Sequence, residues 1–296
     1  MSIFEDILIK NRLFNYGYDD IYVNKEKEFL INYTFNETSN NPWDYENRNK
    51  DGLIILDDKP FIINDAVTDG HNKAQFIVLT NGSRILLKEV EKDEMYMELL
   101  FKELADFLNI PCASYDIVTL NNHEYLASNS FLGIDDLLFD YYKLYEYKNQ
   151  IKYSNIEINI KNLISKSNEI NQTEFLLKAI FIDILTKNND RFPNNFRAIL
   201  RNNNMDICPL FDNGLCGLNR KYHAAYLTYN NRQNTYDILN YIMSYKALKD
   251  WINKLLPFID CDTLKDNIYR KKGIYIDDKT SKIFANNVTE IQKKIL

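Results

Sequence analysis

The strongest constraint on the fold is a change in sequence pattern near residue 130. Between residues 52 and 130, short apolar runs such as LIILD, QFIVL and RILLK are separated by turn signals. From residue 131 onward, most apolar positions recur at helical spacing instead. Short apolar runs bounded by turns favour strands, whereas a repeat of three to four positions favours helices. The pattern predicts an α+β chain whose first part is β-rich and whose second part is mainly helical.

The first part has the signals of an antiparallel sheet with one helix inserted. Asn81-Gly82 lies between QFIVLT and SRILLK, and an Asn-Gly pair in this position is a strong hairpin signal. Asn121-Asn122 joins two further strand-like runs. Between these hairpins, EKDEMYMELLFKELADFLNIP has apolar residues at helical spacing and ends at Pro111.

The second part is expected to be helical around one hairpin. FLGIDDLLFDYYKLYEY is predicted to be a helix, and Thr173 is predicted to cap the helix EFLLKAIFIDILT. FRAIL and DICPLF flank Asn202-Asn203-Asn204 and predict a hairpin, and helices are expected from residue 234 to the end. We divide the chain into an N-terminal extension that packs on the core (1–50), an N-lobe (51–130) and a C-lobe (131–296).

Composition excludes several classes of function. The net charge of −6 and the pI near 5.3 argue against a protein that binds nucleic acid directly by bulk electrostatics. No apolar run is long enough to span a membrane, and the start lacks a signal-peptide pattern. Four cysteines without a C-x-x-C pair and three scattered histidines favour reduced thiols and no zinc site. We therefore expect a cytoplasmic protein.

Two loops carry residues suited to phosphate chemistry. TKNNDRFPNNF, residues 186–196, contains Asp190 and Asn195, and PLFDNG ends an apolar run at Asp212. An amide and a carboxylate are oxygen ligands that suit Mg²⁺, and a separate carboxylate can deprotonate a hydroxyl. The intervening hairpin would bring Asn195 and Asp212 to one edge. This layout is what phosphoryl transfer requires.

The β-rich part supplies candidates for binding the nucleotide. Lys88 ends the strand RILLK, and Glu98 lies ten positions later on the predicted helix. A strand lysine held by a helix glutamate positions the phosphates in kinases. Upstream, TDGHNKAQFIV places Gly70 between two strands, where backbone amides can approach phosphate oxygens. That single glycine is a weak signal compared with G-x-G-x-x-G.

Taken together, these residues resemble the HipA-like serine/threonine kinases, which are bacterial kinases with a bilobal protein-kinase-like fold. The family's catalytic loop N-x-D-x4-N-F is matched by residues 188–196, and its metal motif P-L-[YF]-D is matched by residues 209–212. MYMELLFKELADFLNIPCASYDI is similar to the family's helix and strand after the nucleotide lysine. The resemblance covers roughly residues 65–215. Residues 1–50 are too short for the N-terminal subdomain of full-length members, so the chain resembles the short, core-only form.

The resemblance implies a role for each candidate residue. Asp190 would be the catalytic base, Asn195 and Asp212 the Mg²⁺ ligands, and Lys88, held by Glu98, would contact the ATP phosphates. The family's phosphate loop is similar to the segment that contains Thr68, Gly70 and Lys73, although the segment here is one residue shorter. Thr68 is a candidate for regulatory autophosphorylation. Family members often act in toxin–antitoxin systems, which implies a protein substrate and a small antitoxin protein as partner.

Other interpretations remain open. The loop D-R-F-x-x-N is also close to D-R-H-x-x-N of phosphoinositide lipid kinases, so the acceptor could be a lipid or another small molecule. A pseudokinase that acts as a binding module is a third hypothesis. Taken singly, Asp190 and Asn195 could be turn formers, and Lys88 with Glu98 a solvated pair. Basic residues near the loop either meet an acidic substrate or form a solvated face: Lys187, Arg191, Arg197 and Arg201.

Overall fold

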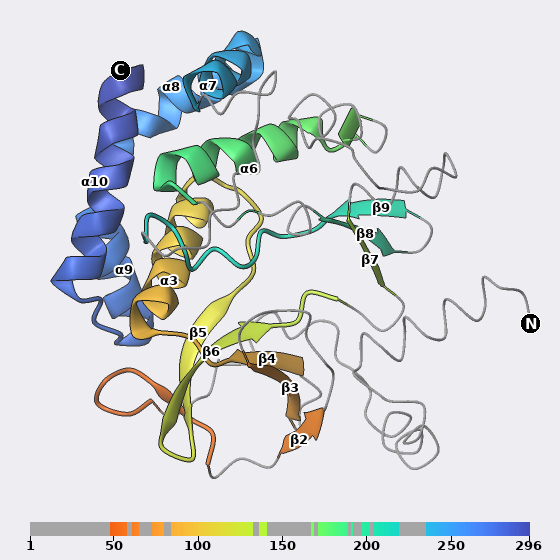
Figure 1. Cartoon of the computed structure of the whole chain (residues 1–296), viewed down its shortest axis with the longest axis vertical. Helices are drawn as coiled ribbons and strands as arrows, with labels where there is room; N and C mark the ends of the chain where they lie inside the picture. The colour runs from red at the N-terminus through yellow and green to blue at the C-terminus, as the bar shows by residue number, and fades with distance from the viewer. Residues whose placement is uncertain are drawn as a thin grey trace, which may run out of the picture.

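The structure is a computed structural model of the chain. It describes residues 48–57, 61–64, 73–79, 84–132, 136–140, 167–168, 171–188, 191, 197–201, 204–218 and 235–296. These residues form two sheets and a group of helices (Figure 1). The N-terminal extension predicted for residues 1–50 lies almost entirely outside the described residues, and the lobe boundaries stay predictions.

The larger sheet has six strands in the order β1-β5-β6-β4-β3-β2. The strands are β1 (Ile54–Ile55), β2 (Phe61–Asn64), β3 (Ala74–Leu79), β4 (Arg84–Lys88), β5 (Tyr115–Leu120) and β6 (His123–Asn129). All neighbours are antiparallel except β1 and β5, which pair in parallel. The two predicted hairpins are confirmed as β3–β4 and β5–β6. Asn121 and Asn122 have φ values of 52° and 61°, the left-handed conformation that a tight two-residue hairpin turn requires.

Helix α3 (Lys92–Phe107) connects β4 to β5 and is the helix predicted between the hairpins. Acidic residues Asp93 and Glu94 lie in its first turn, where they interact favourably with the helix dipole. It ends where Asn109 takes a left-handed φ of 54°, which Asn tolerates better than most residues. Most of its side chains are buried, so α3 is an internal helix and not a surface one.

The smaller sheet consists of β7 (Leu137–Asp140), β8 (Arg197–Arg201) and β9 (Asn204–Ile207), all antiparallel. The β8–β9 hairpin confirms the sequence prediction. The prediction of a helix over FLGIDDLLFDYYKLYEY is wrong for residues 137–140, which form β7. A short apolar run fits either a helix or a strand, and pairing with β8 decides the outcome here. Buried Asp136, just before β7, pairs with Arg201 of β8 at 2.6 Å.

The helical part comprises α6 (Thr173–Thr186), α7 (Thr235–Ser244), α8 (Lys246–Leu255), the short 3₁₀ helix η2 (Leu256–Phe258), α9 (Cys261–Lys272) and α10 (Asp278–Ile295). The helices expected after residue 234 are thus confirmed. The N-cap of α6 is Gln172 and not Thr173, whose hydroxyl instead lies 3.1 Å from the Ser167 hydroxyl. None of the helices in the described ranges is long and apolar enough to cross a membrane.

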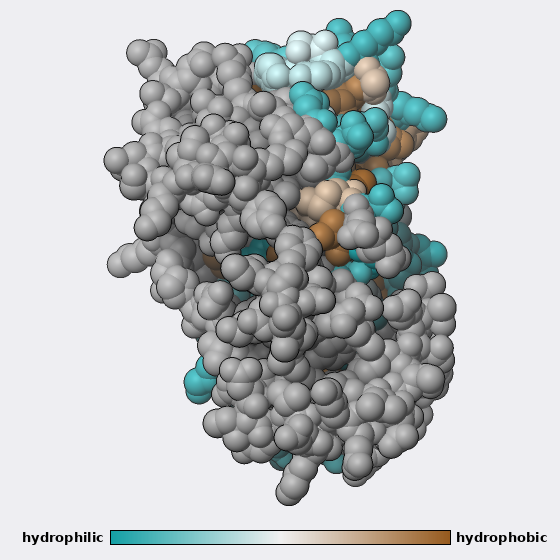
Figure 2. All heavy atoms as spheres, turned by 90° about the vertical axis from the view of Figure 1, so that its right-hand side faces the viewer, coloured by the Kyte–Doolittle hydropathy of each residue, from teal (hydrophilic) through white to brown (hydrophobic). Residues whose placement is uncertain are grey.

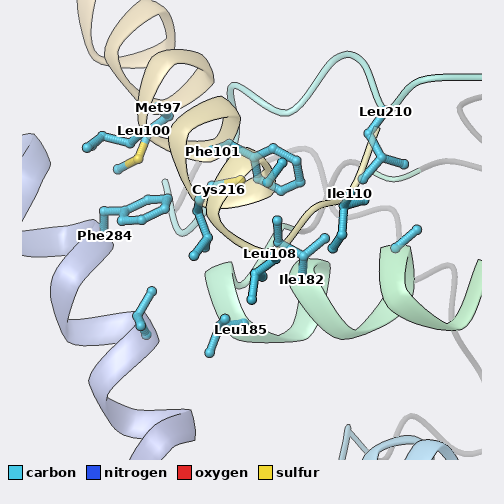
Figure 3. Packing of buried hydrophobic residues seen from close by; sticks show 14 of the residues in the cluster. Met97, Leu100, Phe101, Leu108, Ile110, Ile182, Leu185, Leu210, Cys216 and Phe284 are labelled. Atoms are coloured by element: carbon cyan, nitrogen blue, oxygen red, sulfur yellow. The ribbon is translucent and has the colours of Figure 1, made fainter. Parts of the chain in front are cut away.

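The main hydrophobic core joins the β-rich part to the helical part. Figure 3 shows Phe101 of α3, Ile182 of α6 and Phe284 of α10 in the same buried cluster. Helix α3 also packs against α9 and α10, which lie along one side of it in Figure 1. A smaller cluster that includes Ile77, Ile85 and Leu87 packs within the sheet. Helix α3 is therefore part of the same core as the C-terminal helices.

On the face shown in Figure 2, the visible described residues are mainly hydrophilic, with small separate hydrophobic areas. All four cysteines are free, as the sequence predicts, and burial raises the pKa of the Cys208 thiol to about 12.

Candidate active site

Lys88 and Asp212 meet although 124 positions separate them in the chain. Lys88 is the last residue of β4, and its Nζ lies 2.6 Å from Oδ1 of Asp212. The loop that carries Asp212 is held beside the segment between α3 and β5, because Leu210 exchanges backbone hydrogen bonds with Pro111 and Ala113 at 2.9 and 2.7 Å. The end of the β4 strand and the end of the β8–β9 hairpin therefore meet at one place.

Asp212 has an unusual backbone conformation that a buried tyrosine supports. Its φ is 62°, in the left-handed region that few non-glycine residues adopt. Its backbone N–H donates to the hydroxyl of Tyr115, the first residue of β5, at 3.0 Å. The Asp212 side chain is 40% exposed, so the carboxylate can still be reached by a ligand.

Glu98 holds the residue after Asp212. Its buried carboxylate accepts hydrogen bonds from the backbone N–H of Asn213 at 2.6 Å and from Nδ2 of Asn213 at 3.1 Å. Burial, followed by the charge of Asp212, raises the pKa of Glu98 to about 7, against the opposing effects of Lys88 and Asn213. The expected ion pair between Glu98 and Lys88 is not among the contacts of the described residues. Glu98 belongs to the same site, but it contacts the metal-motif loop instead of the lysine.

Arg191 is buried, which corrects the expectation of either a solvated face or a contact with substrate. Its guanidinium group donates to both carboxylate oxygens of Asp183 on α6, each at 3.0 Å. It also donates to the carbonyl oxygen of Phe211 at 2.8 Å and to Oδ1 of Asn213. Its side chain has no exposed surface. Arg191 therefore connects helix α6 with the loop of Asp212.

Comparison with known proteins identifies the fold of the chain. No family model and no curated protein matches the sequence. The crystal structure of the proinflammatory kinase CtkA of Helicobacter pylori is similar, with a TM-score of 0.63 and 15% identity, over 82% of this chain and 95% of that one. HipA of Shewanella oneidensis MR-1, solved in a toxin–antitoxin complex with HipB and operator DNA, has a TM-score of 0.52 and 13% identity, over 80% of this chain and 63% of that one.

The chain has a HipA-like kinase fold. The sequence prediction of a bilobal α+β kinase fold is thereby confirmed. At these identities the likeness concerns the fold, and the chemistry must be argued from the residues.

The structure describes part of the predicted site. Asp190, Asn195, Thr68 and Gly70 lie outside the described residues. Lys73 directly precedes β3, is well exposed, and lies 3.9 Å from Glu89. The next residue, Ala74, pairs with Lys88 across β3 and β4, so Lys73 and Lys88 lie near the same end of this hairpin.

Sequence reasoning misses three residues of the site. Asn213, Tyr115 and Asp183 gave no signal of their own, because an Asn before Gly, a strand tyrosine and a helix aspartate are all common. Only the burial of polar groups could have indicated them, and burial depends on tertiary packing. Within the described part of the chain, no cluster of three or more His, Cys, Asp or Glu residues could hold a metal ion. Mg²⁺ in nucleotide sites needs one or two carboxylates plus phosphates, and the exposed Asp212 carboxylate fits that requirement.

Proposed function

We propose that this chain is an ATP- and Mg²⁺-dependent protein kinase that phosphorylates serine or threonine. The observation that supports this most directly is the 2.6 Å contact between Lys88 and Asp212 within a HipA-like kinase fold. In kinases, a strand lysine contacts the nucleotide phosphates and a loop aspartate holds Mg²⁺ beside them. The two groups must therefore be neighbours, as Lys88 and Asp212 are.

Each site residue then has one task. Lys88 binds phosphate oxygens of ATP, and Asp212 and Asn195 hold Mg²⁺, which neutralises charge on the phosphates when bound. Asp190 accepts the proton of the acceptor hydroxyl. Thr68, Gly70 and Lys73 form the phosphate loop, and Thr68 is a site of regulatory autophosphorylation. Glu98 acts through Asn213, by holding the loop that carries Asp212.

A role in a toxin–antitoxin system is part of the proposal. HipA was solved together with HipB and operator DNA, and this supports a small antitoxin protein as partner of the present chain. The acceptor would be a protein.

The test is phosphate transfer from labelled ATP in the presence of Mg²⁺. Replacing Asp212 by Asn should lower transfer at least about 100-fold while the circular dichroism melt stays near that of the wild type. Asp206→Asn is the matched control, because Asp206 is also a partly exposed carboxylate. It lies on β9, the strand that precedes the loop of Asp212. Undiminished transfer in Asp212→Asn would sink the assignment.

Mapping the labelled product separates the alternatives. Label on a lipid or small molecule would identify a small-molecule kinase, and nucleotide binding without any transfer would identify a pseudokinase. Because Arg191 is buried against Asp183, its presence in the D-R-F-x-x-N motif gives no support for a lipid acceptor.

A further inference from the structure

Four buried polar side chains form one continuous hydrogen-bonded chain across the site. They are Asp183, Arg191, Asn213 and Glu98, and each is at most 2% exposed. Asp183 belongs to α6 and Glu98 to α3, so the chain crosses the space between these two helices. We refer to these residues as the buried polar chain.

Arg191 is the branching point of the buried polar chain. Its Nε and Nη2 bind the two oxygens of Asp183, its Nη1 binds the carbonyl of Phe211, and Nη2 also donates to Asn213. The guanidinium carbon lies 5.9 Å from the centroid of the Phe101 ring. A lysine could keep the charge balance with Asp183, but its single nitrogen cannot bond all of these groups at once.

Asn213 connects Arg191 to Glu98 within the buried polar chain. Its Oδ1 accepts from Arg191, while its Nδ2 and its backbone N–H both donate to Glu98. The amide side chain is thus engaged at both ends and is held between the Arg191 guanidinium group and the Glu98 carboxyl group. These hydrogen bonds restrict the rotation of the Asn213 side chain and the movement of the backbone beside it.

The positions of Arg191 and Asn213 in the sequence connect the buried polar chain to the proposed reaction. Arg191 directly follows Asp190, the proposed base, and Asn213 directly follows Asp212, the proposed Mg²⁺ ligand. The side-chain hydrogen bond between Arg191 and Asn213 therefore links the residue after the proposed base to the residue after the proposed Mg²⁺ ligand. Phosphoryl transfer depends on the distance between base and metal, since a misplacement of about 1 Å can cost roughly 100-fold in rate.

We propose that Arg191 and Asn213 are positioning residues that fix the catalytic loop and the metal loop relative to each other. This inference rests on the proposed kinase function. A purely structural role is the alternative, and burial of charge alone does not favour either, because apolar residues can often replace a buried ion pair without loss of stability.

The experiment compares three variants of the full chain. Arg191→Lys keeps a charge opposite Asp183 but breaks the branched contacts, and Asn213→Ala breaks the link while leaving the Asp183–Arg191 ion pair. Arg48→Lys is the matched control: Arg48 also holds a fully buried carboxylate, that of Asp116, with two hydrogen bonds of 2.9 and 2.8 Å. For each variant, kcat and KM for ATP, the melting temperature, and amide hydrogen exchange of residues 210–216 are measured.

The expected result separates positioning from stability. Both site variants should lower kcat about 100-fold, change KM for ATP less than about threefold, and speed exchange in residues 210–216. Arg48→Lys should lower the melting temperature yet keep the wild-type kcat. Wild-type kcat in folded Arg191→Lys or in Asn213→Ala would overturn the proposal. If the wild type itself transfers no phosphate, the kinase proposal fails, and hydrogen exchange alone tests the positioning role. Unchanged exchange of residues 210–216 in both site variants would then overturn that role, and faster exchange would support it.

Discussion

The buried carboxyl group of Glu98 should change its protonation state near neutral pH. Burial and the nearby charge of Asp212 raise its pKa from 4.5 to about 7, although Lys88 and Asn213 act in the opposite direction. The folded chain therefore retains this proton to a higher pH than the unfolded chain does. The resulting stabilisation is complete below about pH 4.5 and is lost as the pH rises toward 7.

Replacing Glu98 by Gln should remove this pH dependence. A pKa difference between about 7 and 4.5 corresponds to about 3 kcal/mol, so the wild-type free energy of unfolding should fall by up to that amount between pH 4.5 and 7, relative to Glu98→Gln. Urea unfolding at several pH values measures the difference. Glu89→Gln, at an exposed position just after β4, should follow the wild type. If the free energy of unfolding of Glu98→Gln changed with pH as that of the wild type does, this would contradict the raised pKa of Glu98.

At the residue scale, the sequence assigns Lys88 to the ATP phosphates and Asp212 to Mg²⁺, but it does not predict their pairing. The two side chains lie 2.6 Å apart. The partner of Glu98 was not predictable, because Asn213 competes for the carboxylate only once the loop has folded against α3. The burial of Arg191 was not predictable either, since an arginine in an Asn-rich loop has the pattern of an exposed residue.

At the scale of elements, prediction succeeds where the signal is local. Asn121-Asn122 and Asn202-Asn203-Asn204 mark the β5–β6 and β8–β9 hairpins, and apolar periodicity marks α3. Prediction fails where a distant segment decides the outcome. Strand β7 forms because β8 pairs with its backbone, and β1 pairs in parallel with β5, which lies more than 60 residues away in the chain. Neither pairing leaves a local signal in the sequence.

The β5–β6 turn gives a local test of this view. Asn122 has a φ of 61°, which a β-branched residue adopts only at a cost of roughly 1–2 kcal/mol. Asn122→Val should lower the free energy of unfolding by about that amount, whereas Asn122→Gly should match or exceed the wild type. Because the side chain is exposed, lost packing does not complicate the comparison. Equal stability of the two variants would show that the turn does not require the left-handed conformation.

At the scale of the whole molecule, an ion-pair cluster around Asp116 also joins the sheet to the C-terminal helices. Asp116 of β5 has no exposed surface and accepts hydrogen bonds from Arg48 and from Lys272 of α9. Burial alone would raise the pKa of Asp116, but these two cations outweigh it and lower the pKa. Beside this cluster, the backbones of Gly52 and Gly273 touch. We therefore expect the sheet and the C-terminal helices to unfold as one cooperative unit.

Gly52→Ala tests this cooperativity. A Cβ atom at Gly52 would lie 2.6 Å from the carbonyl oxygens of both Gly273 and Lys272, and the φ of 78° is itself unfavourable for alanine. The new methyl group can be accommodated only if the segment before β1 moves away from α9. We expect a loss of about 2–4 kcal/mol, measured as a lower melting temperature.

Two probes and one control decide the result. In a Trp43→Phe background, the fluorescence of Trp251 reports on α8, and amide exchange of residues 115–120 reports on the sheet. If the connection makes the parts cooperative, both transitions shift down together in Gly52→Ala. Lys50→Ala, at an exposed position in the same segment, should change the free energy of unfolding by less than about 0.5 kcal/mol. A shift confined to the sheet, with the Trp251 transition unchanged, would mean that the helices fold independently of it.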